Sequence, residues 1–333
     1  MLKKEPTVSA VIPNWNGKKV IGDCVRSLKK QSYKLNEIIV VENGSKDGSA
    51  KYISENFPYV TILQQDKNLG FAGGVNVGIK AAKSDYVWLF NNDAEADKDC
   101  LKNIIATAVK NKADIVSSVI LTGNGKLIDS DGDTYSMYGI PFPRHRNAGI
   151  DMVPKKDEPI FSASGGASLY KKSLFDEIGY FDEMFFAYYE DVDLSMRAQL
   201  AAKKIWLSHN AIVHHKMNYT SKKVPGLGEE MTIKNSIYIF WKDLPFPLII
   251  KVFPRFLYAN WRITAITILH RHPRRAVRGQ LLALLHSFHL LKRRIQIQST
   301  RKVTSRQFEE LIDKRNPFRV LKELDKNSPK NRK

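Results

Sequence analysis

The sequence has few cysteines and no long uninterrupted apolar run. Two cysteines in 333 residues exclude a disulfide framework and are typical of a reducing compartment. The longest apolar stretch, residues 246–270, contains Lys251, Arg255 and Arg262, which argues against a membrane-spanning helix. Because no long apolar stretch follows the N-terminus either, we expect no cleavable signal peptide and a cytoplasmic location.

Acidic residues are scarce near the C-terminus. Residues 251–333 contain 21 Lys and Arg but only 5 Asp and Glu, which accounts for +16 of the net charge of +19. The first 250 residues are therefore close to neutral, and their composition is that of an ordinary globular domain. A basic region of this kind predicts an anionic partner: lipid headgroups, nucleic acid or an anionic substrate carrier.

Strand-like and helix-like segments alternate over the first 121 residues. Short apolar runs predict the strands, and apolar residues at helical spacing predict the helices between them. The expected strands are residues 8–12, 37–41, 60–63, 85–90 and 115–121, and the expected helices are 18–30, 47–56, 71–83 and 101–111. This alternation is typical of an α/β fold with a mostly parallel sheet and helices on both faces.

The regular pattern is interrupted between residues 122 and 158, where Gly, Asp, Pro and Tyr dominate. We expect this segment to be an irregular excursion over the surface. Regular structure is expected to resume in five elements. These are the segments 161–170 and 172–178, a helix at 191–202, and two short strands at 205–207 and 211–213.

The C-terminal region is predicted to be helical and amphipathic. Leu and Phe recur at intervals of three and four residues from Leu281 to Leu291, between basic clusters at 271–278 and 292–294. Such a helix either rests in a membrane interface or packs on the domain with its basic face in solvent, and both interpretations remain open. The expected organisation is a first domain at 1–245, a basic helical extension at 246–326 and a disordered tail at 327–333.

Polar residues follow three of the expected strands, at the edge where a parallel sheet binds its ligands. Residues 13–16 follow the first strand, 42–47 the second and 91–95 the fourth. Together they predict a polar ligand with several hydrogen-bonding groups. Asp93 is a candidate ligand for Mg²⁺ or Mn²⁺ beside a phosphate. The alternative is that Asp93 caps the helix that follows it.

Three further motifs are candidates for ligand contacts. Segment 68–74 contains three glycines and opens a helix, so its backbone could approach an anion, although helix packing also explains it. Residues 188–193 place acidic side chains at a helix N-terminus, which fits either capping or a general base in an aromatic pocket. His214 and His215 end a short strand and could complete a metal site or be structural.

Taken together, these segments resemble the family 2 glycosyltransferases of the GT-A fold, and within them the bacterial rhamnosyltransferase-like branch. The resemblance covers about residues 7–245 and rests on motifs that occur in the family's order. The matching motifs are residues 11–16, 40–49, 68–76, 89–93, 165–167, 181–183, 190–194 and His214. The resemblance implies a Rossmann-like GT-A sheet, to which this chain adds a C-terminal basic helical appendage, and a nucleotide-sugar donor.

The resemblance also implies a donor site and a metal site. The implied donor-binding residues are Pro13, Asn14, Asn16, Glu42, Asn43, Asp47, Asn68, Gly70, Asn76, Asn91, Asn92, Gly165 and Gly166. Most family members have Asp at the position of Glu42. Asp93 is implied to bridge a divalent ion, Mn²⁺ or Mg²⁺, to the diphosphate. His214, and not its neighbour His215, matches the family position that completes the metal site.

The general base implied by the resemblance is Asp191, with Tyr189 and Glu190 on the acceptor side. Asp191 would take the proton of the acceptor hydroxyl as its oxygen attacks the anomeric carbon. One direct displacement of this kind inverts the configuration. The Gln-x-x-Arg-Trp motif of processive synthases is missing from the sequence, which predicts that one sugar is added per encounter.

The expected donor is a dTDP-sugar, preferably rhamnose, or a UDP-sugar. The expected acceptor is a lipid-linked or cell-surface glycan precursor, and the basic region would hold the enzyme at the anionic inner face of the cell membrane. Three alternatives are kept: a soluble or protein acceptor, a nucleic-acid-binding protein, and a scaffold without activity. No specific nucleic acid is expected, because the basic residues are interleaved with a leucine-rich stripe.

Overall fold

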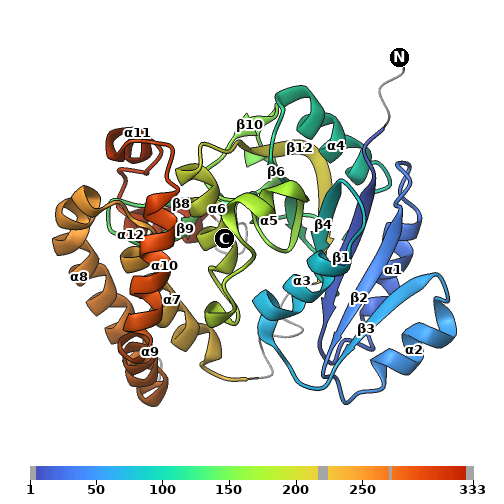
Figure 1. The fold of residues 1–333 in the computed structure, drawn as a ribbon, viewed down its shortest axis with the longest axis horizontal. Helices are drawn as coiled ribbons and strands as arrows, with labels where there is room; N and C mark the ends of the chain where they lie inside the picture. The colour runs from blue at the N-terminus through green and yellow to red at the C-terminus, as the bar shows by residue number, and fades with distance from the viewer. Residues whose placement is uncertain (1–4, 217–223, 270–271, 328–333) are drawn as a thin grey trace.

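The central feature of the fold is a mixed sheet. A computed structural model describes residues 5–216, 224–269 and 272–327. Within these ranges the sheet has ten strands in the order β10-β12-β6-β11-β4-β1-β2-β3, with β5 paired to β12 and β7 to β6 (Figure 1). The strands are β1 (Val8–Asn14), β2 (Glu37–Asn43), β3 (Val60–Gln65), β4 (Tyr86–Phe90), β5 (Ala94–Ala96), β6 (Ile115–Thr122), β7 (Ile128–Ser130), β10 (Glu158–Pro159), β11 (Ala167–Lys171) and β12 (Ile205–His215). A separate hairpin consists of β8 (Asp133–Tyr135) and β9 (Pro141–Pro143).

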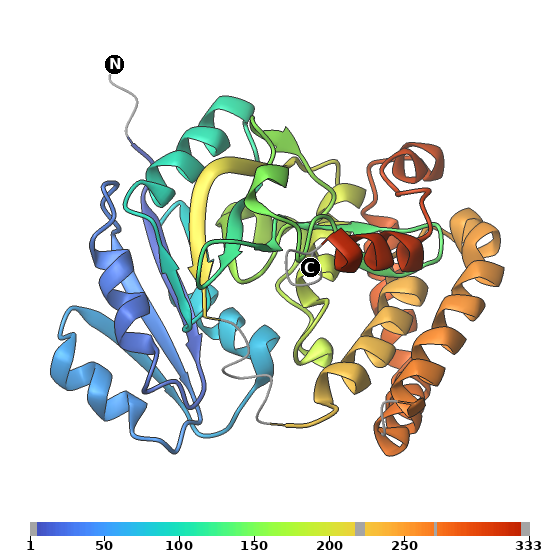
Figure 2. The same cartoon turned by 180° about the vertical axis from the view of Figure 1, so that it is seen from behind.

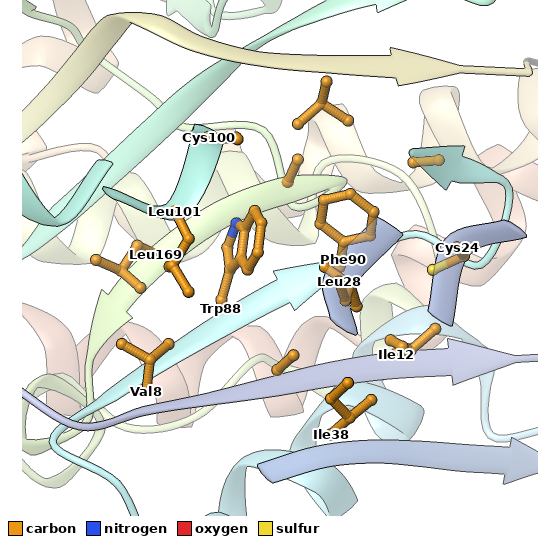
Figure 3. Close-up of a cluster of buried hydrophobic side chains, with 14 of the residues drawn as sticks. Val8, Ile12, Cys24, Leu28, Ile38, Trp88, Phe90, Cys100, Leu101 and Leu169 are labelled. Carbon is orange, nitrogen blue, oxygen red and sulfur yellow. The ribbon is translucent and has the colours of Figure 1, made fainter. Parts of the chain in front are cut away.

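Helices cover both faces of this sheet, as the sequence predicts (Figures 1 and 2). They are α1 (Ile21–Lys29), α2 (Ser49–Asn56), α3 (Gly70–Ala81), α4 (Cys100–Asn111), α5 (Ser173–Ile178) and α6 (Glu190–Leu200). Successive side chains of a strand point to opposite faces. Trp88 and Phe90 of β4 therefore pack in one buried cluster with α1 and α4 (Figure 3), whereas Val87 and Leu89 pack in another with α3 and α5.

The sheet is mostly parallel, and its elements differ from the predicted ones in three places. Strands β1 to β4 pair in parallel, but β11 is antiparallel to both of its neighbours, β4 and β6. The two strands expected at 205–207 and 211–213 are one strand, β12, whose register shifts between Ser208 and Ile212. The irregular excursion at 122–158 contains the short strands β7 to β9 and begins β10.

The C-terminal helices form a bundle at the end of the molecule away from β3 and α2 (Figures 1 and 2). They are α7 (Leu227–Asp243), α8 (Phe246–Leu269), α9 (Pro273–Leu285), α10 (Ser287–Ser299), α11 (Ser305–Glu310) and α12 (Pro317–Asn327). A third apolar cluster packs Tyr238 of α7 and Phe256 of α8 with Val192 and Met196 of α6. None of the helices in the described ranges is long and apolar enough to cross a membrane. The predicted tail at 327–333 lies, apart from its first residue, outside the described residues.

A buried ion network fixes α6 against α7. Lys242 of α7 is fully buried, and its Nζ atom lies 2.8 Å from the Asp182 carboxylate and also contacts Asp193 of α6. Arg197 pairs with Asp193 at 2.8 Å. Burial acts to raise the pKa of Asp182, but Lys242 outweighs it and holds that pKa well below its usual range. Because unpairing a buried charge is costly, the network holds the beginning of α6, where Asp191 lies, in a fixed position.

Candidate active site

The ends of β1, β2 and β4 meet in a buried hydrogen-bond network at the carboxyl edge of the sheet. Asn14 Nδ2 donates to Glu42 Oε2 at 2.9 Å, and Asn92 Nδ2 donates to Asn14 Oδ1 at 2.7 Å. Ser49 Oγ donates to Glu42 Oε2 at 2.8 Å. Glu42 is fully buried, and its carboxylate fixes the side chain of Asn14. The three polar strand ends lie together, as the predicted parallel order implies.

Other predicted donor residues shape the loops at this edge. Asn16 and Asp47 each accept a backbone N–H from a neighbouring loop, at 2.8 and 2.9 Å. Asn43 and Asn68 do the same for the turn before α3, at 2.9 and 2.8 Å. Pro13 is half-buried at the end of β1. These side chains therefore fix the backbone that would surround a ligand.

His215 connects two carboxylates at the end of β12. Its Nε2 atom lies 2.9 Å from Asp93 Oδ1, and its Nδ1 atom lies 2.7 Å from Asp129 Oδ2. Adjacent residues of a strand point to opposite sides, and His214 Nε2 lies 3.2 Å from Asp97 Oδ1. The histidine that lies beside Asp93 is therefore His215, whereas the resemblance implied His214 for the metal site.

Asp129 is a site residue that sequence reasoning misses. It lies in the three-residue strand β7, inside the excursion that was expected to be irregular. The signal that could have found it is the alternation of Asp129, Asp131 and Asp133, which places carboxylates at a strand-like spacing. Burial acts to lower the pKa of His215, but hydrogen bonds to Asp129 and Asp93 outweigh burial and raise it to about 9.

Asp93 and His215 have the donor atoms that a divalent ion needs beside a diphosphate, with the ion displacing the His215 Nε2 proton that now faces Asp93. In the part of the chain that the structure describes, no group of three or more His, Cys, Asp or Glu side chains forms a metal site by itself. A carboxylate oxygen and an imidazole nitrogen suffice where substrate phosphates and water complete the coordination of Mg²⁺ or Mn²⁺. Asp129 bonds the far nitrogen of His215, as in sites where a carboxylate orients a ligand histidine. The residues therefore fit an ion that binds together with a diphosphate.

Asp191 lies in the first turn of α6, against the Gly165–Gly166 turn. Its Oδ2 atom accepts the N–H of Gly165 at 2.8 Å, and its Oδ1 atom accepts the N–H of Val192 at 2.9 Å. The carbonyl of Gly166 accepts the N–H of Asn91 at 2.8 Å, so the turn joins Asp191 to the end of β4. Burial raises the pKa of Asp191, which makes its carboxylate a better proton acceptor.

Two further predicted contact residues, Asn76 and Glu190, are buried. Asn76 of α3 donates to the carbonyl of Phe181 at 2.9 Å and accepts its N–H at 3.1 Å. Glu190 is 6% exposed, and burial followed by the charge of Asp191 raises its pKa well above its ordinary value. Asn76 thereby holds the segment at Phe181. The donor contact of Asn76 and the acceptor contact of Glu190 stay predictions.

Asp133 of β8 is a second residue that the sequence reasoning misses. Burial and the charge of Asp191 raise its pKa to about 7. Its backbone is held by two hydrogen bonds with Ser162, at 3.0 and 3.1 Å. Burial and the Asp133 charge also raise the pKa of Tyr189, which is half-buried. The charge of Asp191 therefore acts on Asp133, and the charge of Asp133 acts on Tyr189.

The loop before α6 has an unusual backbone that α7 holds in place. Phe186, Tyr188 and Tyr189 have φ of 65°, 68° and 66°, a left-handed conformation that costs about 1 kcal/mol or more per non-glycine residue. Asn235 Nδ2 of α7 donates to the carbonyls of Ala187 at 2.9 Å and Tyr188 at 2.6 Å. The strained backbone lies directly before the predicted base, and hydrogen bonds from α7 hold it in this conformation.

Replacing Asn235 by Ala is expected to lower kcat about tenfold while the donor Kd changes little. The substitution removes the hydrogen bonds that hold two loop carbonyls, at a cost of about 1–3 kcal/mol to the strained conformation. The matched control is Ser236→Ala, because this buried hydroxyl donates to the carbonyl of Ile233 in its own helix and, among the described residues, not to the loop before α6. Equal kcat values for the two variants would contradict the assignment.

Gly70 should not tolerate a side chain. Its φ is +74°, and a Cβ atom there would lie 2.4 Å from the carbonyl oxygen of Phe186. Gly48 has a similar φ of +78°, but the nearest atom to its Cβ is Lys18 Nζ at 3.7 Å. We expect Gly48→Ala to lose about 1 kcal/mol of stability and Gly70→Ala to lose about 2 kcal/mol more, together with activity. Urea unfolding and a turnover assay on both variants measure this difference.

The fold and the site together define a protein of the GT-A class. A model of the family described as "Glycosyl transferase family 2" matches residues 9–179, so the chain belongs to that family. The predicted family is thereby confirmed.

The chain is similar to curated glycosyltransferases over part of their length. It is 24% identical over 203 residues to the low-salt glycan biosynthesis hexosyltransferase Agl10 of Haloferax volcanii. That alignment covers 58% of this chain and 61% of the relative. It is 24% identical over 209 residues to the N-acetylglucosaminyl-diphospho-decaprenol L-rhamnosyltransferase of Mycobacterium tuberculosis, which covers 56% and 68%. The chain thus spans less than two thirds of the first of these relatives.

A solved structure of similar fold contains a nucleotide sugar and a metal ion. It is the mannosyltransferase PcManGT from Pyrobaculum calidifontis in complex with GDP-Man and Mn²⁺. The two chains align with a TM-score of 0.54 at 15% identity, over 90% of this chain and 86% of that one. At this identity the likeness confirms the fold.

Proposed function

We propose that this protein is an inverting glycosyltransferase that moves one sugar from a nucleoside-diphosphate sugar to an acceptor hydroxyl. The observation that carries the proposal is the Gly165–Gly166 turn. It joins Asp191, a carboxylate whose pKa burial raises, to the strand end that precedes Asp93 and its partner His215. A proton acceptor and a pair of ion-binding groups are therefore held at one edge of the sheet.

In the proposed reaction the acceptor oxygen bonds the anomeric carbon while the bond from that carbon to the diphosphate oxygen breaks. Asp191 receives the hydroxyl proton, and the nucleoside diphosphate leaves with the electron pair. Asp93 and His215 would hold the divalent ion, which when bound neutralises charge on the diphosphate. The Asp129 carboxylate keeps the ring of His215 in place.

The proposed donor is a dTDP-sugar with rhamnose preferred, and a UDP-linked hexose is the alternative. The motif resemblance and the similarity to the mycobacterial L-rhamnosyltransferase support rhamnose. In this proposal the base and ribose bind next to the buried hydrogen-bond network of Asn14, Glu42 and Asn92. A Cβ atom at Gly166 would lie 3.0 Å from Asn91 Nδ2. Glycine at this position therefore supports a sugar site beside Asn91.

The proposed acceptor is a glycan precursor carried on a membrane lipid, and a soluble or protein acceptor is the alternative. The net charge of +16 over residues 251–333 supports a location on an anionic membrane surface at the cytoplasmic face. The decaprenol-linked substrate in the name of the mycobacterial relative also supports it. An anionic lipid carrier would then be concentrated at the surface where the enzyme resides.

Calorimetric titration with a panel of nucleotide sugars, with and without Mn²⁺ or Mg²⁺, tests the proposal. We expect one donor to bind in a metal-dependent manner. A folded protein that binds no nucleotide and no nucleotide sugar under any of these conditions would contradict it.

A further inference from the structure

The C-terminal helices expose large apolar side chains to an unusual degree. Among the residues that the structure describes, fifteen of the twenty-two exposed large apolar side chains lie on α8, α9 and α10. Trp261 is 67% exposed, Leu284 is 70% exposed and Phe288 is 80% exposed. Exposed apolar residues that gather on adjoining elements mark an interaction surface, whereas single ones need no explanation.

These side chains form two stripes. On α8 the stripe has intervals of four and seven residues, which keeps its members on one helix face. Its members are Phe246, Ile250, Leu257, Trp261 and Ile268. The second stripe has alternating intervals of four and three residues and continues from α9 into α10. Its members are Val277, Leu281, Leu284, Phe288, Leu291 and Ile295.

The opposite sides of the same helices are buried. Three side chains on these sides are at most 5% exposed: Ala276 and Ala283 of α9 and Leu290 of α10. Gly279 of α9 is also buried and lies close against α7. The stripes are therefore the faces that remain after the helices have packed on the protein. Helix α8 lies beside α9 at the end of the molecule (Figures 1 and 2).

The charged residues of α8, α9 and α10 themselves are all basic. Residues 244–308 contain no Asp or Glu, whereas Arg255, Arg274 and Lys292 are exposed on the three helices. A second copy of the chain seated on this surface would bring the same positive charge against it. An anionic bilayer supplies both an apolar interior for the stripes and negative headgroups for the basic residues.

We propose that helices α8, α9 and α10 dock on an anionic membrane by inserting the two apolar stripes into its interface. The docking does not depend on the proposed enzymatic reaction. It goes beyond attraction of a basic region, because insertion of apolar side chains persists when salt screens the charges. Arg275 of α9 pairs with Glu230 of α7 at 2.8 Å, so the docking helices are fixed to the helix that supports the loop before Asp191.

Vesicle flotation of the full chain measures this docking. Vesicles of phosphatidylcholine with phosphatidylglycerol are compared at low salt and at roughly 1 M NaCl, where the screening length is only about 3 Å. We expect binding to persist at high salt. The triple variant Trp261→Ser, Leu284→Ser, Phe288→Ser should weaken it about a hundredfold or more, because apolar burial drives interfacial binding. The control, Val109→Ser with Ile150→Ser, removes apolar side chains that are 52% and 51% exposed elsewhere and should bind like the original chain.

A second signal is the fluorescence of Trp261, which should shift to shorter wavelength on vesicles; the shift should be lost in Trp261→Phe. Two results would overturn the proposal. One is complete release of the original chain at high salt, which leaves only charge attraction. The other is self-association in solution that the triple variant abolishes, which assigns the stripes to a second copy. Donor titration of the triple variant should be unchanged, so loss of docking and failure of the proposed function are separate outcomes.

Discussion

Asp191→Asn is expected to lower kcat by about 10² to 10⁴-fold, the range of a lost general base. The amide cannot accept the hydroxyl proton, while its size leaves the Gly165–Gly166 turn in place. Both carboxylate oxygens accept backbone N–H groups, so the amide loses one of these bonds at a cost of about 1 kcal/mol. The donor Kd should stay within a few-fold, because Asp191 acts on the acceptor.

The pH dependence gives an independent readout of the same group. A base must be deprotonated to act, so the rate falls as the pH drops through its pKa in the folded enzyme. Burial raises the pKa of Asp191 above the ordinary value of 3.8, so the acid limb of kcat should lie above that value. Asp191→Asn should abolish this limb. A variant with kcat within tenfold of the original enzyme and an unchanged acid limb would contradict the assignment.

His215→Ala and Asp93→Ala are expected to remove the metal-dependent part of donor affinity, about tenfold to a hundredfold. Both side chains meet at 2.9 Å, where the diphosphate is expected. Asp129→Asn should cost less, because Asp129 orients His215 and does not face the ion.

The matched control for this prediction is His214→Ala. His214 is adjacent in sequence, but it pairs with Asp97 on the other side of β12 and should leave the affinity unchanged. Titrations with and without Mn²⁺ on the four variants measure the effect. Equal losses in His214→Ala and His215→Ala, or a wild-type affinity that ignores the metal, would contradict this account of the site.

The core of the α/β unit is predictable because its signals are local. The strand β4 is a run of apolar residues buried on both faces, and α4 has apolar residues at helical spacing. Each element was therefore expected within a few residues of its observed bounds. The antiparallel direction of β11 has no such local signal, since it depends on how the excursion at 122–158 returns to the sheet.

The choice between His214 and His215 shows where sequence reasoning stops. Alternation along a strand predicts opposite sides for the two histidines, but not which side faces the ligand. The register of β12 shifts between Ser208 and Ile212, and a bulge of this kind changes the phase of every following side chain. Asp129 was not predicted as a site residue for a related reason. Its strand, β7, has three residues, which are too few for a strand periodicity to be recognised.

The C-terminal helices pack on the domain with one side, as one of the two interpretations predicts, and membrane binding through the other side stays a prediction. Apolar residues on one side, such as Phe256, Ala283 and Leu290, pack against the protein, while others, such as Leu285 and Phe288, are exposed on the other side. Amphipathic spacing alone does not distinguish these sides, because both repeat at intervals of three and four residues. Only the tertiary contacts of α7 with α9 and α10 separate them.

The most direct test of the central claim is sugar transfer from the donor identified by titration. Membrane lipids are extracted, the purified protein and a radiolabelled donor are added with Mn²⁺, and label in the lipid fraction is counted beside the release of nucleoside diphosphate. We expect both signals with the original chain and loss of both with Asp191→Asn, although that variant still binds the donor. Label transfer that is equal in the two proteins, or donor binding with no transfer to any lipid, soluble or protein acceptor, would contradict the account.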